Sequence, residues 1–201
     1  MAKRGQAADA DAAQMKPEWR AIVFDPLSYI SPQRLALPPG LANPQSRAIV
    51  NDMLIDAYSL DTRLSGSEIS NPAQKFLRHW PRLPQAAYLM GCQTLRAELL
   101  RQGAILRLPV WAQAFARLPL GTAPGRASGS RVSHRDLTCA GYLHLLRWRD
   151  WLPPALAQRL PLLFPPMVDR LAATGQADAQ LLTLALQQAG RHPFAPPSNP
   201  D

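Results

Sequence analysis

The sequence predicts an all-α or predominantly α protein, built as a single compact multi-helix domain with flexible N- and C-terminal tails. Three observations lead to this fold class. Apolar side chains recur at helical spacing in at least five segments. No segment alternates apolar and polar residues as a half-buried strand does. Several of the helical segments are preceded by a proline, which fits the first turn of a helix.

The longest helical segment without a proline beyond its first turn runs from Arg82 to Gly103, and we expect the other helices to pack against it. Leu83 and Pro84 start this helix and Gly103 ends it. Its buried stripe is predicted to consist of Tyr88, Cys92, Leu95 and Leu99, widened by Ala86, Leu89 and Leu100. The opposite, exposed side is expected to carry Arg96, Glu98 and Arg101.

Shorter helices are expected before and after this segment. Asn43-Pro44 and Asn71-Pro72 are helix starts, because asparagine can cap free N–H groups and proline fits the first turn. Ser133, followed three residues later by Asp136, is close to a capping box. The helices predicted in this way cover residues 44–58, 72–80, 110–117, 134–149, 154–160, 166–173 and 176–189. The apolar run 21–24 fits a strand or an extended lead-in.

The distribution of apolar residues sets the expected domain limits. Residues 1–17 are expected to form a flexible tail, because they contain almost no large apolar side chain. The helical domain is expected to span 18–191, with a flexible loop at 121–130, and a Pro-rich tail at 192–201 follows. The sequence shows no signal peptide and no apolar run of membrane-spanning length, so we expect a soluble protein of the reducing cytoplasm.

The net charge of +8 is unevenly distributed along the chain. Twelve basic residues lie between Lys75 and Arg149, where the only acidic residues are Glu98 and Asp136. This excess indicates an acidic partner, which could be nucleic acid, an anionic membrane surface or an acidic protein. The competing interpretation is base composition, because arginine outnumbers lysine 19 to 3, as a GC-rich gene would produce.

No catalytic, cofactor-binding or metal-binding residue is predicted. His134-Arg135-Asp136-Leu137 resembles the catalytic loop of protein kinases, but Gly141 stands where that loop needs an asparagine. Cys139 and His144 are five residues apart and His134 and His144 ten apart, so neither pair shares a helix face for a metal. A catalytic Cys/His pair stays open, although a small buried cysteine is the more common state of this residue.

Two sequence segments resemble the SctK family of type III secretion proteins, also called YscK or PscK. The first is Phe24-Asp25-Pro26 followed by Tyr29, and the second is the sequence LIDAYSLDT at 54–62; their order and spacing agree with the family's N-terminal motifs. The central helix is similar to the family's next apolar helix, in the residues Leu89, Met90, Gly91 and Arg96. The resemblance covers residues 19–120, and beyond the loop at 121–130 only the length and the leucine-rich character are similar.

The resemblance implies a non-enzymatic cytoplasmic adaptor that is needed for protein secretion by the type III injectisome. Such adaptors join the cytoplasmic domain of the inner-membrane ring protein SctD to the SctQ pods, which connect through SctL to the ATPase SctN. No cofactor, nucleic acid or membrane insertion is implied. From charge and expected exposure we predict Arg96, Arg101 and Arg107 as partner-binding residues.

The alternative function is that of a basic helical nucleic-acid-binding protein. The arginine excess in the middle of the chain supports it, and Trp80, Trp111, Trp148 and Trp151 could stack on bases beside arginines. Tryptophans at helical spacing are more often part of a core. No pair of helices with the exposed polar face of a DNA-reading motif is evident.

Overall fold

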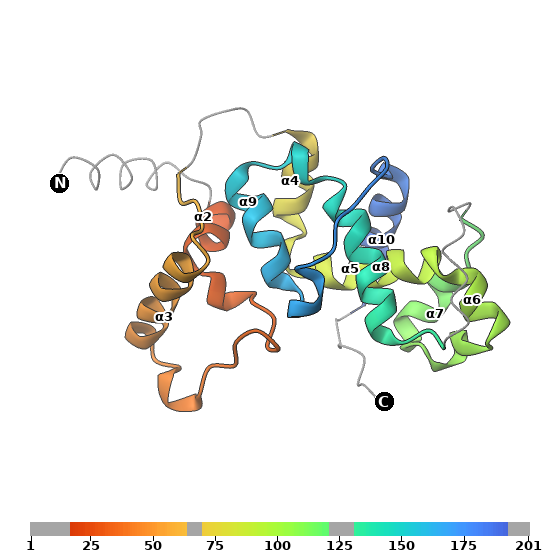
Figure 1. The fold of residues 1–201 in the computed structure, drawn as a ribbon, viewed down its shortest axis with the longest axis horizontal. Helices are drawn as coiled ribbons and strands as arrows, with labels where there is room; N and C mark the ends of the chain where they lie inside the picture. The colour runs from red at the N-terminus through yellow and green to blue at the C-terminus, as the bar shows by residue number, and fades with distance from the viewer. Residues whose placement is uncertain (1–16, 64–69, 121–130, 193–201) are drawn as a thin grey trace. The chain divides into compact units, whose positions relative to one another are not determined.

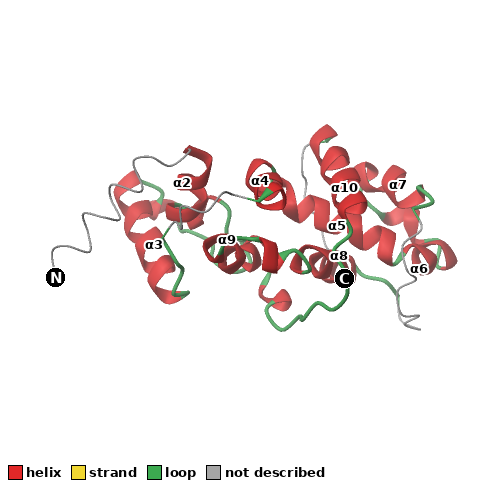
Figure 2. Ribbon diagram, turned by 90° about the horizontal axis from the view of Figure 1, so that it is seen from above, coloured by secondary structure: helices red, strands yellow, loops and turns green. Residues whose placement is uncertain are grey.

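The computed structural model describes residues 17–63, 70–120 and 131–192, and these contain helices, turns and loops but no strand (Figures 1 and 2). The predicted helical fold class is therefore confirmed. The predicted flexible segments at 1–17, 121–130 and 192–201 lie outside the described residues, apart from Pro17 and His192. None of the described helices is long and apolar enough to cross a membrane.

The chain divides into two compact units, and both are discontinuous in sequence. Unit 1 comprises residues 1–78 and 150–169, and unit 2 comprises 79–149 and 170–201. The domain limits of 18–191 stay a prediction. The α-helices of unit 1 are α2 (Pro17–Phe24), α3 (Pro44–Ala57), α4 (Asn71–Arg78) and α9 (Pro154–Arg159), with short 3₁₀ turns at Pro26–Ser28, Pro39–Leu41, Leu160–Leu163 and Pro166–Val168.

Two expectations for unit 1 are wrong. The run 21–24 is the end of helix α2, because Trp19, Ile22 and Val23 are buried at the helical spacing that four residues alone could not show. The helix expected at 166–173 is a single 3₁₀ turn, of which only Val168 is buried. Residues 170–173 have no buried side chain that would stabilise a continued helix.

Helix α3 is the best-defined helix of unit 1, because both of its ends are capped. The Asn43 side chain accepts a hydrogen bond from the Ser46 N–H at 2.8 Å, which confirms the predicted cap. At the other end Ser59 adopts the left-handed conformation, with φ of 49°. The Leu60 N–H then bonds the Ile55 carbonyl at 2.9 Å and the Ser59 N–H bonds the Asp56 carbonyl at 3.0 Å. These two bonds form a Schellman motif, and the motif LIDAYSLDT is therefore a helix end followed by its cap.

Two arginines connect the N-terminal segment of unit 1 to its C-terminal segment. Arg34 forms a two-pronged ion pair with Asp169 and also bonds the Phe164 carbonyl. Arg159 is fully buried and donates to the carbonyls of Val23 at 2.7 Å and Asp61 at 2.8 Å. Each arginine thereby satisfies backbone carbonyls of a segment that is distant in sequence. An apolar cluster joins the same segments through Ile30, Leu54, Leu60 and Leu162.

Helix α5 is the centre of unit 2, as the sequence predicts for the start of the segment 82–103. It packs most extensively on α8, and then on α10 and α7. All of its residues from 85 to 93 are buried, so it has no exposed face along this stretch. The α-helices of unit 2 are α5 (Leu83–Thr94), α6 (Arg96–Arg101), α7 (Val110–Arg117), α8 (His134–Leu146) and α10 (Ala179–Arg191), with 3₁₀ turns at Trp80–Arg82 and Ala104–Arg107 (Figure 1).

Two glycines allow α5 and α8 to approach closely. A Cβ atom added at Gly91 would lie 1.8 Å from the Leu137 carbonyl oxygen, and one added at Gly141 would lie 1.6 Å from that of Ala87. Both distances are far shorter than any real contact, so the two backbones touch where these glycines lie. The asparagine position that a kinase loop requires is thus the place where α8 has no room for a side chain.

The predicted central helix is interrupted at Leu95, and the interruption changes which residues are buried. Leu95 leaves the helical conformation, with φ of −102° and ψ of 21°, and α6 begins after it. As a result Leu95 is half-buried, Leu100 is 49% exposed and Glu98 is buried. The predicted burial of Leu95 and Leu100 and the predicted exposure of Glu98 are wrong, because they assume one continuous helix. Tyr88, Cys92 and Leu99 are buried as expected.

The starts of the remaining helices show how far capping signals can be read from the sequence. Ser133 and Asp136 form the predicted capping box of α8, with the Asp136 N–H 3.2 Å from the Ser133 hydroxyl. Helix α10 begins at Ala179 and not at Gln176, because the Asp178 side chain caps it by accepting from the Leu181 N–H at 2.8 Å. Helix α7 has the predicted bounds.

Candidate functional site

The predicted partner-binding arginines lie on two consecutive elements of unit 2. Arg96 begins α6 and Arg101 ends it, and Arg107 ends the 3₁₀ turn that follows. Arg101 and Arg107 are exposed, whereas Arg96 is half-buried and donates to the Arg117 carbonyl at 3.5 Å. Arg101 and Arg107 are therefore available to a partner, whereas the Arg96 side chain is hydrogen-bonded within unit 2.

Exposed apolar side chains accompany these two arginines. Leu100 is 49% exposed, Leu106 72% and Val110 84%. We call residues 100–110 the basic–apolar segment. Large exposed apolar side chains that occur together mark interaction surfaces more often than isolated ones do. Sequence reasoning missed this feature because it placed Leu100 in the core.

The basic–apolar segment is held in a defined conformation. Gly103 turns the chain with a φ of 60°, which glycine adopts without strain. Ala104, Ile105 and Leu108 are buried beneath the turn. The Gln113 side chain of α7 donates to the Leu108 carbonyl at 3.0 Å and fixes the turn to α7. Leu106, Arg107 and Val110 are thus displayed on a rigid support, which lowers the entropy lost when a partner binds.

Two histidines of unit 2, His134 and His144, are hydrogen-bond partners between helices. His134 Nδ1 lies 2.6 Å from the Tyr88 hydroxyl, and His144 Nε2 lies 2.8 Å from the Thr94 hydroxyl. Burial, reinforced by the charge of Arg147, lowers the pKa of His144 to about 4. Burial also lowers the pKa of His134. Both rings are therefore neutral near pH 7 and join α8 to α5.

The two cysteines do not have the properties of catalytic nucleophiles. Cys92 is completely buried in α5, and burial raises the pKa of its thiol far above the usual range. Burial also raises the pKa of the Cys139 thiol. Because the thiolate is the reactive form, both side chains stay protonated and unreactive near pH 7. Within the described segments, no three His, Cys, Asp or Glu side chains are grouped as a metal site would require.

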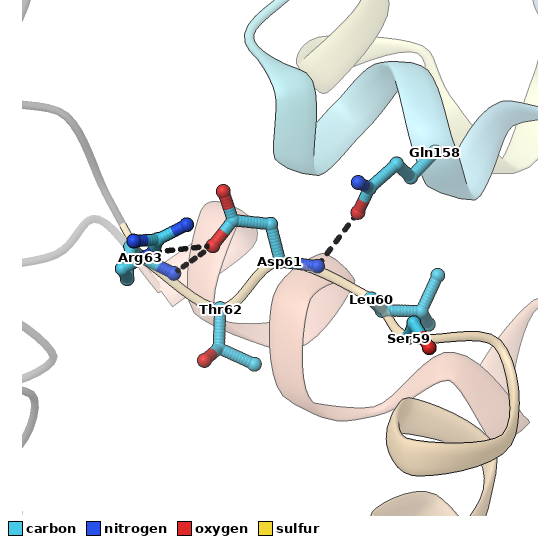
Figure 3. Close-up of a pocket in the computed structure, with 6 residues that line it drawn as sticks. All are labelled: Ser59, Leu60, Asp61, Thr62, Arg63 and Gln158. Atoms are coloured by element: carbon cyan, nitrogen blue, oxygen red, sulfur yellow. Dashed lines mark hydrogen bonds and ion pairs between the residues drawn. The ribbon is translucent and has the colours of Figure 1, made fainter.

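Unit 1 contains an open polar pocket of about 520 Å³ (Figure 3). It is lined by Ser59, Leu60, Asp61, Thr62, Arg63 and Gln158. The Gln158 side chain accepts from the Asp61 N–H at 2.6 Å, and Asp61 accepts from the Arg63 backbone N–H at 2.9 Å and from its side chain at 3.1 Å.

Three of the polar residues that line this pocket, Asp61, Arg63 and Gln158, are hydrogen-bonded to one another. The Arg63 backbone N–H lowers the pKa of the Asp61 carboxyl, so the group stays ionised and acts as an acceptor within the loop. The pocket joins residues 97 positions apart in sequence, which is why sequence reasoning did not find it. Its geometry explains how the loop after α3 is anchored to α9.

An exposed segment that combines apolar and basic side chains is typical of proteins that bind other proteins. The comparisons agree with this class. Residues 19–191 match the family of bacterial type III secretion apparatus proteins called OrgA_MxiK, and the chain belongs to this family. The match extends well beyond residue 120, where the recognisable motifs end, and includes α8, α9 and α10.

Two relatives show the extent of the similarity. The chain is 42% identical over 181 residues to the oxygen-regulated invasion protein OrgA of Salmonella typhimurium, which covers 90% of both chains. It is 25% identical over 179 residues to protein MxiK of Shigella flexneri, which covers 87% of this chain and 90% of the relative. Both relatives are members of the SctK family, so the predicted resemblance is confirmed. No solved structure matches the chain.

Proposed function

We propose that this protein is a non-enzymatic adaptor of the type III secretion sorting platform. It links the cytoplasmic domain of SctD to the SctQ pods, and through SctL to the ATPase SctN, at the cytoplasmic face of the bacterial inner membrane. Membership of a type III secretion apparatus family carries this proposal. The absence of a convincing active site in the sequence and the exposed basic–apolar segment support it.

The basic–apolar segment is proposed to contact an acidic partner. Leu106 and Val110 would supply apolar area to the centre of the interface, and Arg101 and Arg107 would supply charge and hydrogen bonds around it. Arginine is enriched among residues that dominate binding energy, and complementary charge accelerates encounter and selects the partner. Arg96 contributes less in this proposal, because its side chain is half-buried and bonded to Arg117.

The test combines a deletion with a charge reversal in a secreting strain. Deletion is expected to abolish secretion and pod assembly. Arg101→Glu with Arg107→Glu is expected to reduce secretion at an unchanged protein level, because both side chains are exposed and their replacement does not disturb the core. A matched control is Arg20→Glu with Arg170→Glu, which makes the same charge change at exposed positions of unit 1 and unit 2 outside the segment.

Binding is measured with purified proteins. The SctD cytoplasmic domain and SctQ are each titrated with the full-length chain, and a three-component complex is then sought by analytical ultracentrifugation. The Arg101→Glu and Arg107→Glu variant should associate more slowly with the acidic partner only. If secretion and pod assembly survive deletion of the whole protein, the adaptor function is wrong, whatever the arginines do.

A further inference from the structure

The outward face of α3 in unit 1 presents apolar side chains to solvent. Ile49 is 60% exposed and Met53 is 63% exposed, and they lie one helical turn apart. Ala57, one further turn along the same row, is also exposed. In the sequence Ile49 and Met53 recur at helical spacing with other apolar residues, whereas the structure buries Asn51 and Leu54. An apolar ridge is therefore left on the solvent side.

Two carboxylates run along one edge of this ridge. Asp52 and Asp56 are exposed, lie one turn apart and each precede a residue of the apolar face. The only basic residue of α3, Arg47, is 3.7 Å from Asp25 and is therefore directed toward the N-terminal segment. The outward face is thus apolar with an acidic edge, which is the opposite charge from the basic–apolar segment of unit 2.

The buried side of α3 fixes the outward face in place. Asn51 accepts from the Leu27 N–H at 2.8 Å and donates to the Asp25 carboxylate at 2.7 Å. Leu54 is part of the apolar cluster of unit 1, and both helix ends are capped. A helix held in this way changes little when a partner binds, so little of the binding free energy is spent on ordering it.

We propose that this face of α3 docks an amphipathic helix of a partner protein, with apolar residues one turn apart and lysine or arginine along one edge. Asp52 and Asp56 would pair with these basic residues, and they would repel nucleic acids and anionic lipid surfaces. Ala57, one turn beyond Met53 on the same face, would let the partner helix approach closely. The inference rests on the proposed function, because an adaptor needs a second surface for a partner unlike that of the basic–apolar segment.

The experiment exchanges apolar residues on each surface separately. Ile49→Ser with Met53→Ser should weaken binding of one of the two proposed partners, SctD cytoplasmic domain or SctQ, at least tenfold and leave the other within twofold. The matched control, Leu106→Ser with Val110→Ser, should do the reverse, because these side chains are at least as exposed. Circular dichroism and thermal unfolding should be unchanged in both variants.

A charge variant tests the acidic edge. Asp52→Asn with Asp56→Asn should slow association with the α3 partner several-fold at low salt and change dissociation little, because exposed charges act mainly on encounter. Glu18→Gln with Asp150→Asn removes the same charge at exposed positions elsewhere and should have no effect. Equal effects of the two charge variants would overturn the assignment of the acidic edge.

A photo-crosslinking amino acid at position 53 identifies the occupant in secreting cells. A crosslink to a helix with apolar residues one turn apart and a basic edge supports the inference. A crosslink to a second copy of this chain, to lipid, or to nothing overturns it. If the Ile49→Ser and Met53→Ser variant binds both purified partners normally, the α3 surface is wrong and the adaptor function stands. If the unmodified chain binds neither partner, the adaptor function fails, and the crosslink at position 53 still decides for α3.

Discussion

At the scale of single residues, Ser59 has a conformation that fits its position but not its side chain. Its φ of 49° places a residue with a Cβ atom in the left-handed region, at the position where helices usually have glycine. The left-handed conformation costs about 1–2 kcal/mol for a residue with a Cβ atom. Glycine avoids this strain, but it loses more backbone entropy on folding, which costs roughly 0.5–1 kcal/mol. Ser59→Gly should therefore stabilise unit 1 by about 0.5–1 kcal/mol in urea unfolding, and a loss of stability would show that the hydroxyl is required.

His144 gives the protein a defined response to acid. Its pKa is lowered from 6.5 to about 4, so the unfolded chain binds a proton between these values and the folded chain does not. Stability is therefore constant above pH 6.5, falls as the pH decreases from about 6.5 to 4, and changes no further below pH 4 through this group. The difference between a pKa of 6.5 and one of about 4 corresponds to a loss of at most about 3 kcal/mol.

The His144→Gln variant isolates this response, because glutamine can still hydrogen-bond the Thr94 hydroxyl but does not titrate. Urea unfolding is measured at pH 7, 5.5 and 4 for both forms. The variant should lose less stability than the unmodified chain over this range. Parallel curves would mean that the ring is accessible enough to keep its ordinary pKa.

At the scale of elements, the contact between α5 and α8 depends on Gly91 and Gly141. A methyl group at either position would overlap a carbonyl oxygen of the other helix, and neither backbone can move without disturbing a buried surface. Gly141→Ala should destabilise unit 2 by at least about 2 kcal/mol. Gly40→Ala is the control, because a Cβ there meets nothing within 4 Å, and it should be nearly neutral. If Gly141→Ala and the unmodified chain had equal denaturation midpoints, α5 and α8 would be able to move apart without a loss of stability.

Helix positions could be predicted from the sequence where the determining residues are local. The caps at Asn43 and Ser133 and the turn at Gly103 are set by side chains within three residues of the helix end. The burial of Glu98 and the exposure of Ile49 and Leu100 could not be predicted in this way. They depend on the break at Leu95 and on which neighbouring elements cover a face, and both are tertiary effects.

The candidate surfaces, too, contain residues that could be predicted from the sequence and residues that could not. Arg101 and Arg107 could be selected because charge is visible in the sequence and charged residues are rarely buried. The apolar members of both surfaces could not, because an apolar residue at helical spacing is normally assigned to the core. The role of Arg159 was hidden for another reason, since the carbonyls that it bonds lie 136 and 98 residues away.

At the scale of the whole molecule, the salt response separates the adaptor from a nucleic-acid-binding protein. A protein that neutralises several phosphates loses affinity steeply as salt rises. We expect weak, sequence-independent binding to duplex DNA at low salt that disappears by physiological ionic strength, measured by fluorescence anisotropy. Arg101→Glu with Arg107→Glu should weaken it further at low salt. Tight, sequence-dependent binding at physiological salt would favour the nucleic-acid-binding function instead.

The discontinuous sequence of unit 1 has a consequence for the protein while it is being translated. Arg34 leaves the ribosome 135 residues before Asp169, its ion-pair partner, and Leu54 and Leu60 emerge more than 100 residues before Leu162, which covers them. At the usual elongation rates of about 5–20 residues per second this interval is on the order of 10 s. Throughout this interval the nascent chain lacks Leu162, which completes the apolar cluster of unit 1. A premature stop before residue 160 would therefore release a chaperone substrate, not a shortened adaptor.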